Sequence, residues 1–157
     1  MAILVIWQMM KFFDRINDGE HWVGQVLASW HISIGVLLLL LVLPRIFWAL
    51  RNQDNRPAAP EAPTHRALTK AGHAALYIAM ALLPITGISI MIGNGYGLSF
   101  FGLELVPAGT DIPWLASFGG ALHSPVAWVL AALVIGHVVM ALWHQFVRKD
   151  GLLLRMA

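Results

Sequence analysis

The stretch that most constrains this chain is the apolar run over residues 119–146, GGALHSPVAWVLAALVIGHVVMALWHQF, which contains His123, His137 and His144. About 20 consecutive apolar residues cross the hydrocarbon core of a bilayer as a helix, and histidine within such a span is costly and usually functional. His123 and His137 are 14 residues apart. At about 100° and 1.5 Å per residue, a helix places them within roughly 40° of each other and about 21 Å apart along its axis. The spacing predicts ligands for two cofactors stacked across a membrane.

The composition agrees with a lipid environment, because 59% of the 157 residues are hydrophobic and only 11% are charged, against about 25% charged in a typical soluble domain. The net charge of +2 gives no reason to expect a nucleic-acid partner. The chain has no cysteine, which excludes disulfides, cysteine-ligated zinc, iron–sulfur clusters and covalently attached c-type haem. The seven histidines are therefore the main supply of metal ligands.

We expect an all-α integral membrane four-helix bundle formed by a single domain, residues 1–157. Three full transmembrane helices are predicted over residues 28–50, 71–92 and 120–146. The apolar segment 1–13 is too short for a span, since ten residues cover about 15 Å as a helix, roughly half the hydrocarbon core. It is predicted to be the second half of a truncated first helix, with a short interfacial helix as the alternative.

The connecting segments are polar or rich in glycine and proline. Residues 11–27 are predicted to form an aqueous loop, and the proline-rich residues 51–70 an extended connector. Residues 93–120 are predicted to be a glycine-rich loop. Its apolar piece, Leu98–Val106, is expected to lie in the membrane interface or to cover the edge of a cofactor.

Two prolines bear on the shape of the spans. Pro44 is expected to kink the last turns of the first full span. Pro125 suits the first turn of a helix, where the missing N–H of proline has no cost. If the last helix begins there, His123 lies at its cap and the 14-residue geometry becomes approximate.

The basic residues give the orientation of the chain in the membrane. Residues 93–120 contain no lysine or arginine, whereas eight of the ten basic residues flank the connector or follow the last span: Arg45, Arg51, Arg56, Arg66, Lys70, Arg148, Lys149 and Arg155. Cytoplasmic loops carry an excess of lysine and arginine. The connector 51–70 and the C-terminus are therefore predicted to be cytoplasmic, and loops 11–27 and 93–119 to face outward.

This orientation sorts the histidines by depth. His31 and His123 each begin a span that descends from the outer side, whereas His73 and His137 lie towards the inner side. A six-coordinate haem iron takes one imidazole on each side. We therefore predict His31 and His123 as metal ligands for an outer haem. His137 is a third predicted ligand, and His73 is its only candidate partner on a neighbouring full span, as an iron ligand or as a propionate contact. His144 is predicted to contact a propionate or a lipid headgroup.

At this point the chain resembles the bacterial cytochrome b561 family of four-helix, dihaem b-type membrane cytochromes. The motifs that carry the resemblance are Trp30-His31 followed by Ser33 and Gly35, AGHAALYIAMALLPITG (71–87), FFGLELVP (100–107), ALHSPVAWVLAALVIGHVVMALWH (121–144) and DGLLLRM (150–156). The resemblance implies two non-covalent haem b groups in a multi-pass protein of the bacterial inner membrane, with the two outward loops in the periplasm.

The resemblance also shows that this sequence lacks one of the two ligands expected for the second haem. In the family, one haem is held by the residues that correspond to His31 and His123. The other is held by the residue that corresponds to His137 and by a histidine early in the first helix, in a His-Trp pair that this sequence lacks. Three explanations stay open: the start of the chain is misassigned, His73 substitutes, or the inner haem is lost or five-coordinate.

The function implied by the resemblance is electron transfer across the membrane between an outer donor, superoxide being one candidate, and the quinone pool, with ubiquinone or another membrane quinone as partner. Whether the chain is an oxidoreductase or a pure electron carrier is left open, and no side chain is predicted as a catalytic acid or base. One alternative is a haem-carrying anchor subunit for a hydrogenase or formate dehydrogenase, and another is a haem-free histidine-relay transporter. Possible protein partners are a second copy of the chain or a dehydrogenase subunit; the lipid bilayer is the surrounding solvent.

Overall fold

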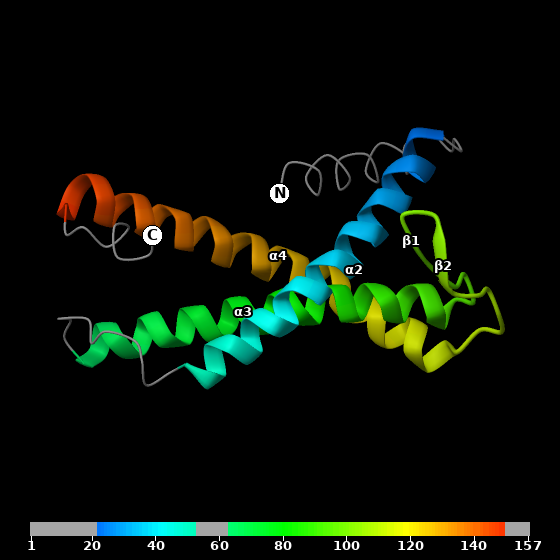
Figure 1. The fold of residues 1–157 in the computed structure, drawn as a ribbon, viewed down its shortest axis with the longest axis horizontal. Coiled ribbons are helices and arrows are strands. Elements are labelled where there is room, and N and C mark those ends of the chain that lie inside the picture. Colours follow the sequence, from blue (N-terminus) through cyan, green and yellow to red (C-terminus); the bar gives the residue numbers. More distant parts are fainter. Residues whose placement is uncertain (1–21, 53–62, 150–157) are drawn as a thin grey trace.

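The computed structural model describes residues 22–52 and 63–149. It contains three long helices, one of which crosses the other two obliquely in the view of Figure 1, and a two-stranded hairpin at one end. In chain order the elements are α2 (Trp22–Arg51), α3 (Pro63–Gly93), β1 (Leu98–Phe100), β2 (Leu103–Val106), α4 (Pro113–Trp143) and a π-helical turn, η1 (His144–Arg148). The expectation of a mostly helical chain is confirmed. Segments 1–13 and 150–157 lie outside the described residues, so the truncated first helix stays a prediction.

Each of the three helices contains a segment long and apolar enough to cross a membrane: Ala28–Arg51, Ala67–Gly93 and Pro113–Arg148. These segments contain the three predicted spans, with somewhat wider bounds at most ends. Large apolar side chains are exposed along them, among them Leu41, Trp128 and Val139. Exposed apolar surface on this scale is what a chain solvated by lipid presents. The three full spans therefore agree with the structure.

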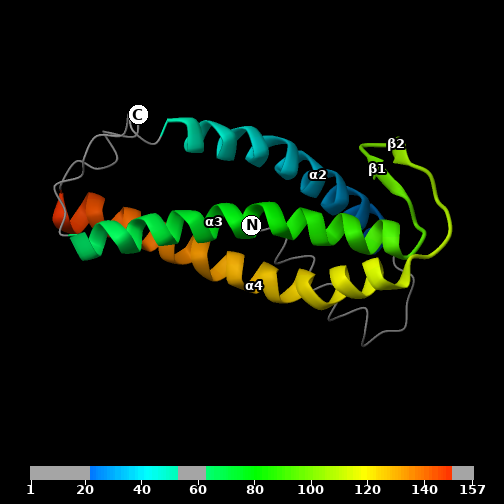
Figure 2. The same ribbon diagram turned by 90° about the horizontal axis from the view of Figure 1, so that it is seen from below.

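Helix α3 is the central element, because it packs against both α2 and α4. Figure 2 shows α3 and α4 running side by side with α2 on the other side of α3. The hairpin lies beside the start of α2 (Figure 1). We call this the hairpin end of the bundle. The opposite end, where α2 and α4 finish and α3 begins, is the basic end, because it carries Arg45, Arg51, Lys70, Arg148 and Lys149.

Glycine brings α3 and α4 into backbone contact near the hairpin end. A Cβ atom at Gly119 would lie 2.6 Å from the carbonyl oxygen of Thr86 and 2.8 Å from the backbone nitrogen of Ile90. A Cβ atom at Gly93 would overlap the backbone nitrogen of Ala116. Membrane helices associate through such small residues, which let their backbones approach closely. These contacts fix the position of α4 on α3 at the level of His123.

Gly119→Ala is expected to destabilise the protein by about 1–3 kcal/mol, because the added methyl group overlaps backbone atoms that move only with the helix. Gly120→Ala is the matched control, since a Cβ atom at the neighbouring Gly120 has no contact within 4 Å. Thermal unfolding of both variants in the same detergent measures the difference. Equal midpoints for the two variants would contradict the close packing at Gly119.

The start of α4 differs from the expectation. The helix begins at Pro113, with proline in its first turn, and Pro125 lies inside it. Residues 113–120, predicted as loop, are therefore helical. Proline does suit the first turn of a helix, but the proline in that position of α4 is Pro113 and not Pro125. Consequently His123 stands well inside a continuous helix, and its spacing to His137 along one helix is confirmed.

Two other segments are more helical than predicted. Residues 63–70 are the first turns of α3, which opens with Pro63, so the extended connector is wrong over these residues. Residues 22–27 belong to α2 and not to a loop. Helix α2 also continues through Pro44 to Arg51, and the kink expected there stays a prediction. In lipid a helix satisfies its own backbone groups, which favours extending it past local breakers.

The piece Leu98–Val106 forms the hairpin, an element that the all-α expectation did not include. Its strands are antiparallel, with Phe100 opposite Leu103. The turn residues Phe101 and Gly102 have φ of 48° and 87°. Positive φ at both central positions is the geometry that a two-residue hairpin prefers, and glycine supplies it at low cost.

Candidate functional site

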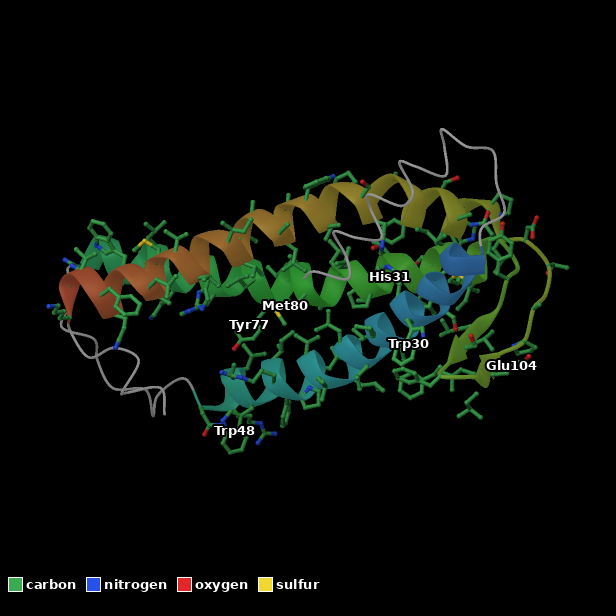
Figure 3. All side chains as sticks on the ribbon, turned by 90° about the horizontal axis from the view of Figure 1, so that it is seen from above. Trp30, His31, Trp48, Tyr77, Met80 and Glu104 are labelled. Carbon is green, nitrogen blue, oxygen red and sulfur yellow. The ribbon has the colours of Figure 1, made fainter. Side chains whose placement is uncertain are left out.

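His31 and His123 face each other at the hairpin end. Their ring centroids are 6.0 Å apart and the ring planes are inclined by 87°. His31 comes from α2 and His123 from α4, two helices that make only marginal backbone contact with each other over the described residues. Figure 3 shows His31 on the side of α2 that faces the other helices. The structure thus brings together the two residues predicted to share the first haem.

His73 and His137 form a second facing pair, towards the basic end. Their ring centroids are 5.5 Å apart, with an interplanar angle of 62°. His73 is half-buried on α3, whereas His137 is exposed on α4 in the isolated chain. The separation of 14 residues along α4 puts the two pairs at levels about 21 Å apart. His144, the first residue of η1, belongs to neither pair.

Thr86 holds the imidazole of His123 from the α3 side. Its side chain is fully buried, with 0% exposure. The hydroxyl Oγ1 lies 3.0 Å from Nδ1 of His123 and 2.8 Å from the carbonyl oxygen of Leu83. Gly87 is next to the same ring, since a Cβ atom there would lie 3.1 Å from Cε1 of His123. Both residues are at the end of the motif AGHAALYIAMALLPITG (71–87), but the contact of Thr86 with His123 was not predicted.

Ser33 attaches the hairpin to α2, two residues after His31. Its buried hydroxyl donates to the carbonyl oxygen of Ser29 and accepts the N–H of Phe101, both at 2.9 Å. The rings of Trp30 and Phe101 pack edge to face, with centroids 5.7 Å apart. The hairpin therefore packs on the face of α2 that carries Trp30 and Ser33, whereas His31 lies on the side that faces the other helices (Figure 3). The expectation that this piece covers a cofactor edge stays a prediction.

The first pair has the spacing of two ligands that share one metal ion. Metal–imidazole bonds are about 2.0–2.1 Å long and the ring centroid lies about 1.1 Å beyond the nitrogen, so two such rings have centroids about 6.3 Å apart. The observed 6.0 Å for His31 and His123 is close to that value. The 5.5 Å of His73 and His137 requires the rings to separate by less than about 1 Å.

The surroundings of the first pair also suit a flat macrocycle. Gly35 is one turn after His31 on α2, and a Cβ atom there would meet nothing within 4 Å. The described residues contain no group of three or more histidine, aspartate or glutamate side chains that could hold a metal ion alone. A haem needs only two protein ligands, because the porphyrin supplies four. The residues present therefore fit a bis-histidine haem.

Comparison with known proteins gives a consistent result. The family model described as prokaryotic cytochrome b561 matches residues 1–157, the whole chain. The chain is 38% identical to cytochrome b561 homolog 2 of Escherichia coli K12 over 127 residues, which cover 80% of this chain and 68% of that protein. It is 36% identical to a protein of Yersinia pestis named "Probable superoxide oxidase CybB" over 160 residues, covering 99% of this chain and 87% of that protein.

A match to one family model along the full chain, a relative that is named a cytochrome b561 homolog, and three apolar helices agree with one another. The membership implies a b-type haem and a role in membrane electron transfer. It thus confirms the resemblance read from the histidine motifs. The chain belongs to the prokaryotic cytochrome b561 family and is an integral bacterial membrane protein.

Proposed function

We propose that this protein carries electrons across the bacterial inner membrane through two b-type haems, one between His31 and His123 and one between His73 and His137. The observation that carries the proposal is the presence of two facing histidine pairs at different levels of the same helix, α4. A single pair would hold one redox centre on one side of the bilayer. Two pairs about 21 Å apart along α4 provide a relay through it.

The side chains in this scheme hold and surround the cofactors. Haem iron supplies one-electron redox chemistry when bound, and the protein tunes it through axial ligands, hydrogen bonds and burial. His31 and His123 would hold the haem iron at the hairpin end, and Gly35 would leave room beside it. No step of this function requires a side chain to act as an acid or base.

The basic end supplies positive charge near the second pair. The guanidinium carbon of Arg45 lies 5.7 Å from the centroid of the Tyr77 ring, and Tyr77 is one turn beyond His73 on α3. Figure 3 shows Tyr77 projecting towards α2. A cation within about 6 Å of an aromatic face is attracted to it, which holds Arg45 in this region. We propose that Arg45, with His144, partners the propionates of the second haem.

The charge distribution also suggests which way the electrons run. Among the described residues, the loop at the hairpin end carries only Glu104 and Asp111, whereas cations gather at the basic end. The positive-inside rule then places the basic end in the cytoplasm and the hairpin in the periplasm. We propose a periplasmic donor and a quinone, ubiquinone or a similar molecule, as acceptor. Superoxide is the favoured donor because the relative from Yersinia pestis is named a probable superoxide oxidase.

An optical spectrum of the purified full chain tests the proposal. The dithionite-reduced minus oxidised difference is expected to show a sharp α-band of the b type, and haem analysis to give about two haems per chain. Addition of a superoxide source with a soluble ubiquinone analogue is expected to reduce the quinone through the haems. Absence of the α-band would contradict the cytochrome function. Normal haem content without quinone reduction by superoxide would contradict the donor and leave an anchor-type relay as the better description.

A further inference from the structure

We propose that Thr86 fixes the tautomer of His123, so that Nδ1 carries the proton and Nε2 is free to bind a metal. This inference rests on the proposed function, in which His123 is an axial ligand. Thr86 contributes through His123 and not by contact with the metal, so its part is that of a positioning residue. The observation behind it is the pair of short contacts made by one fully buried hydroxyl group.

The two contacts can be assigned by counting protons. A threonine hydroxyl has one proton to donate and two lone pairs that accept. Threonine within a helix commonly donates to the carbonyl oxygen three or four residues earlier. Leu83 is three residues before Thr86, and its carbonyl oxygen lies 2.8 Å from Oγ1. With its only proton used there, Oγ1 meets Nδ1 of His123 as an acceptor, at 3.0 Å.

The consequence concerns the other ring nitrogen. If Nδ1 of His123 donates its proton to Thr86, then Nε2 has a free lone pair, because a neutral imidazole carries one N–H. The opposite arrangement, with the hydroxyl donating to Nδ1, would place the proton on Nε2 and block metal binding there. The contact with Leu83 therefore selects the tautomer that can bind a metal through Nε2.

Backbone packing holds the ring in the position that this hydrogen bond needs. Gly87 borders the imidazole, and a Cβ atom there would lie 3.1 Å from Cε1 and 3.5 Å from Nδ1 of His123. Gly119, one turn before His123 on α4, brings its helix against the carbonyl oxygen of Thr86. Thr86 and Gly87 of α3 thus contact the imidazole of His123 at the level where the backbones of α3 and α4 touch.

A hydrogen bond from the far nitrogen of a metal-bound imidazole makes it a more basic ligand. A more basic axial ligand stabilises ferric over ferrous iron and lowers the reduction potential, which second-shell hydrogen bonds are known to tune. Loss of the Thr86 hydroxyl is therefore expected to raise the midpoint potential of the haem held by His31 and His123. The haem held by His73 and His137 serves as an internal reference in the same sample.

The experiment compares Thr86→Val, which removes the hydroxyl but keeps the shape, with Thr86→Ser, which keeps the hydroxyl. Redox titration and electron paramagnetic resonance of the oxidised full chain are expected to show one haem changed in Thr86→Val, with a higher midpoint and an altered low-spin signal. Thr86→Ser is expected to behave like the unmodified protein. Two unchanged haems in Thr86→Val would overturn the inference while leaving the proposed function intact.

A second measurement avoids any dependence on the folding of a variant or on haem. In the unmodified full chain, prepared without haem and labelled with nitrogen-15 histidine, the ring resonances of His123 report its tautomer, and a His123→Gln sample identifies them. A proton on Nδ1 is the expected result. A proton on Nε2 would overturn the inference. Failure of the proposed function would show separately, as absence of the haem spectrum in the unmodified protein.

Discussion

His123→Ala is expected to lose the haem at the hairpin end and to lower the haem content from about two to about one per chain. The alanine removes one of the two imidazoles that face each other at 6.0 Å. The remaining ligand, His31 on α2, would bind the iron alone, from a helix that has little contact of its own with α4 over the described residues. Haem extraction and the low-spin signals of the oxidised protein measure the loss.

The pairing of His123 with His31 can be tested by comparing the variants of the two residues. His31→Ala is expected to remove the same spectral component as His123→Ala, and the double variant to remove no more than either single one, because both residues serve one iron. His144→Ala is the control for this spectral component, since His144 lies at the other end of the same membrane-spanning segment, in neither pair, and is proposed to contact only the second haem. Loss of different components from the two single variants would contradict the pairing of His31 with His123.

This pairing is the part of the site that the sequence predicts well. The charge pattern gives each span a direction, and this direction predicts that His31 and His123 lie at the same depth. Each span is a regular helix, in which position along the chain converts directly into depth, so the sequence predicts the proximity of the two rings. The predicted depth in the bilayer is therefore sufficient to identify His31 as the partner of His123. Their role as ligands of one haem stays a prediction.

The elements that the sequence did not predict depend on contacts between distant residues. The hairpin is attached by a hydrogen bond between Phe101 and Ser33, which are 68 residues apart. The contact between Thr86 and His123 spans 37 residues. The periodic pattern of residues within one helix gives no information about contacts between residues so far apart in the sequence. The start of α4 differs from the expectation for another reason, since Pro113 and Pro125 suit a first helical turn equally well and the structure begins the helix at Pro113.

For the partner of His137 in the second haem site, the sequence leaves several explanations open, and the structure favours one of them. On sequence grounds His73 was one of several ways to complete the ligand set of His137. The structure places the two rings 5.5 Å apart, from two helices that pack directly against each other. This proximity favours His73 as the residue that completes the ligand set of His137.

His73→Ala is accordingly expected to remove the haem at the basic end and to leave the one at the hairpin end. The observed separation of the rings is below the spacing of two ligands of one metal ion by less than about 1 Å, so that binding one iron requires only a small outward movement of the rings.

The measurement is the same pair of readouts, haem content and low-spin signals, with His137→Ala as the reference for complete loss of the second site. If His73 is the sixth ligand, the two variants lose the same signal, and the midpoint of the remaining haem is unchanged. If His73 only hydrogen-bonds a propionate, His73→Ala keeps both low-spin signals and shifts one potential. That second outcome would contradict the ligand assignment and direct the search for the partner of His137 to residues 1–21, where His21 is the only histidine, or to a segment preceding Met1.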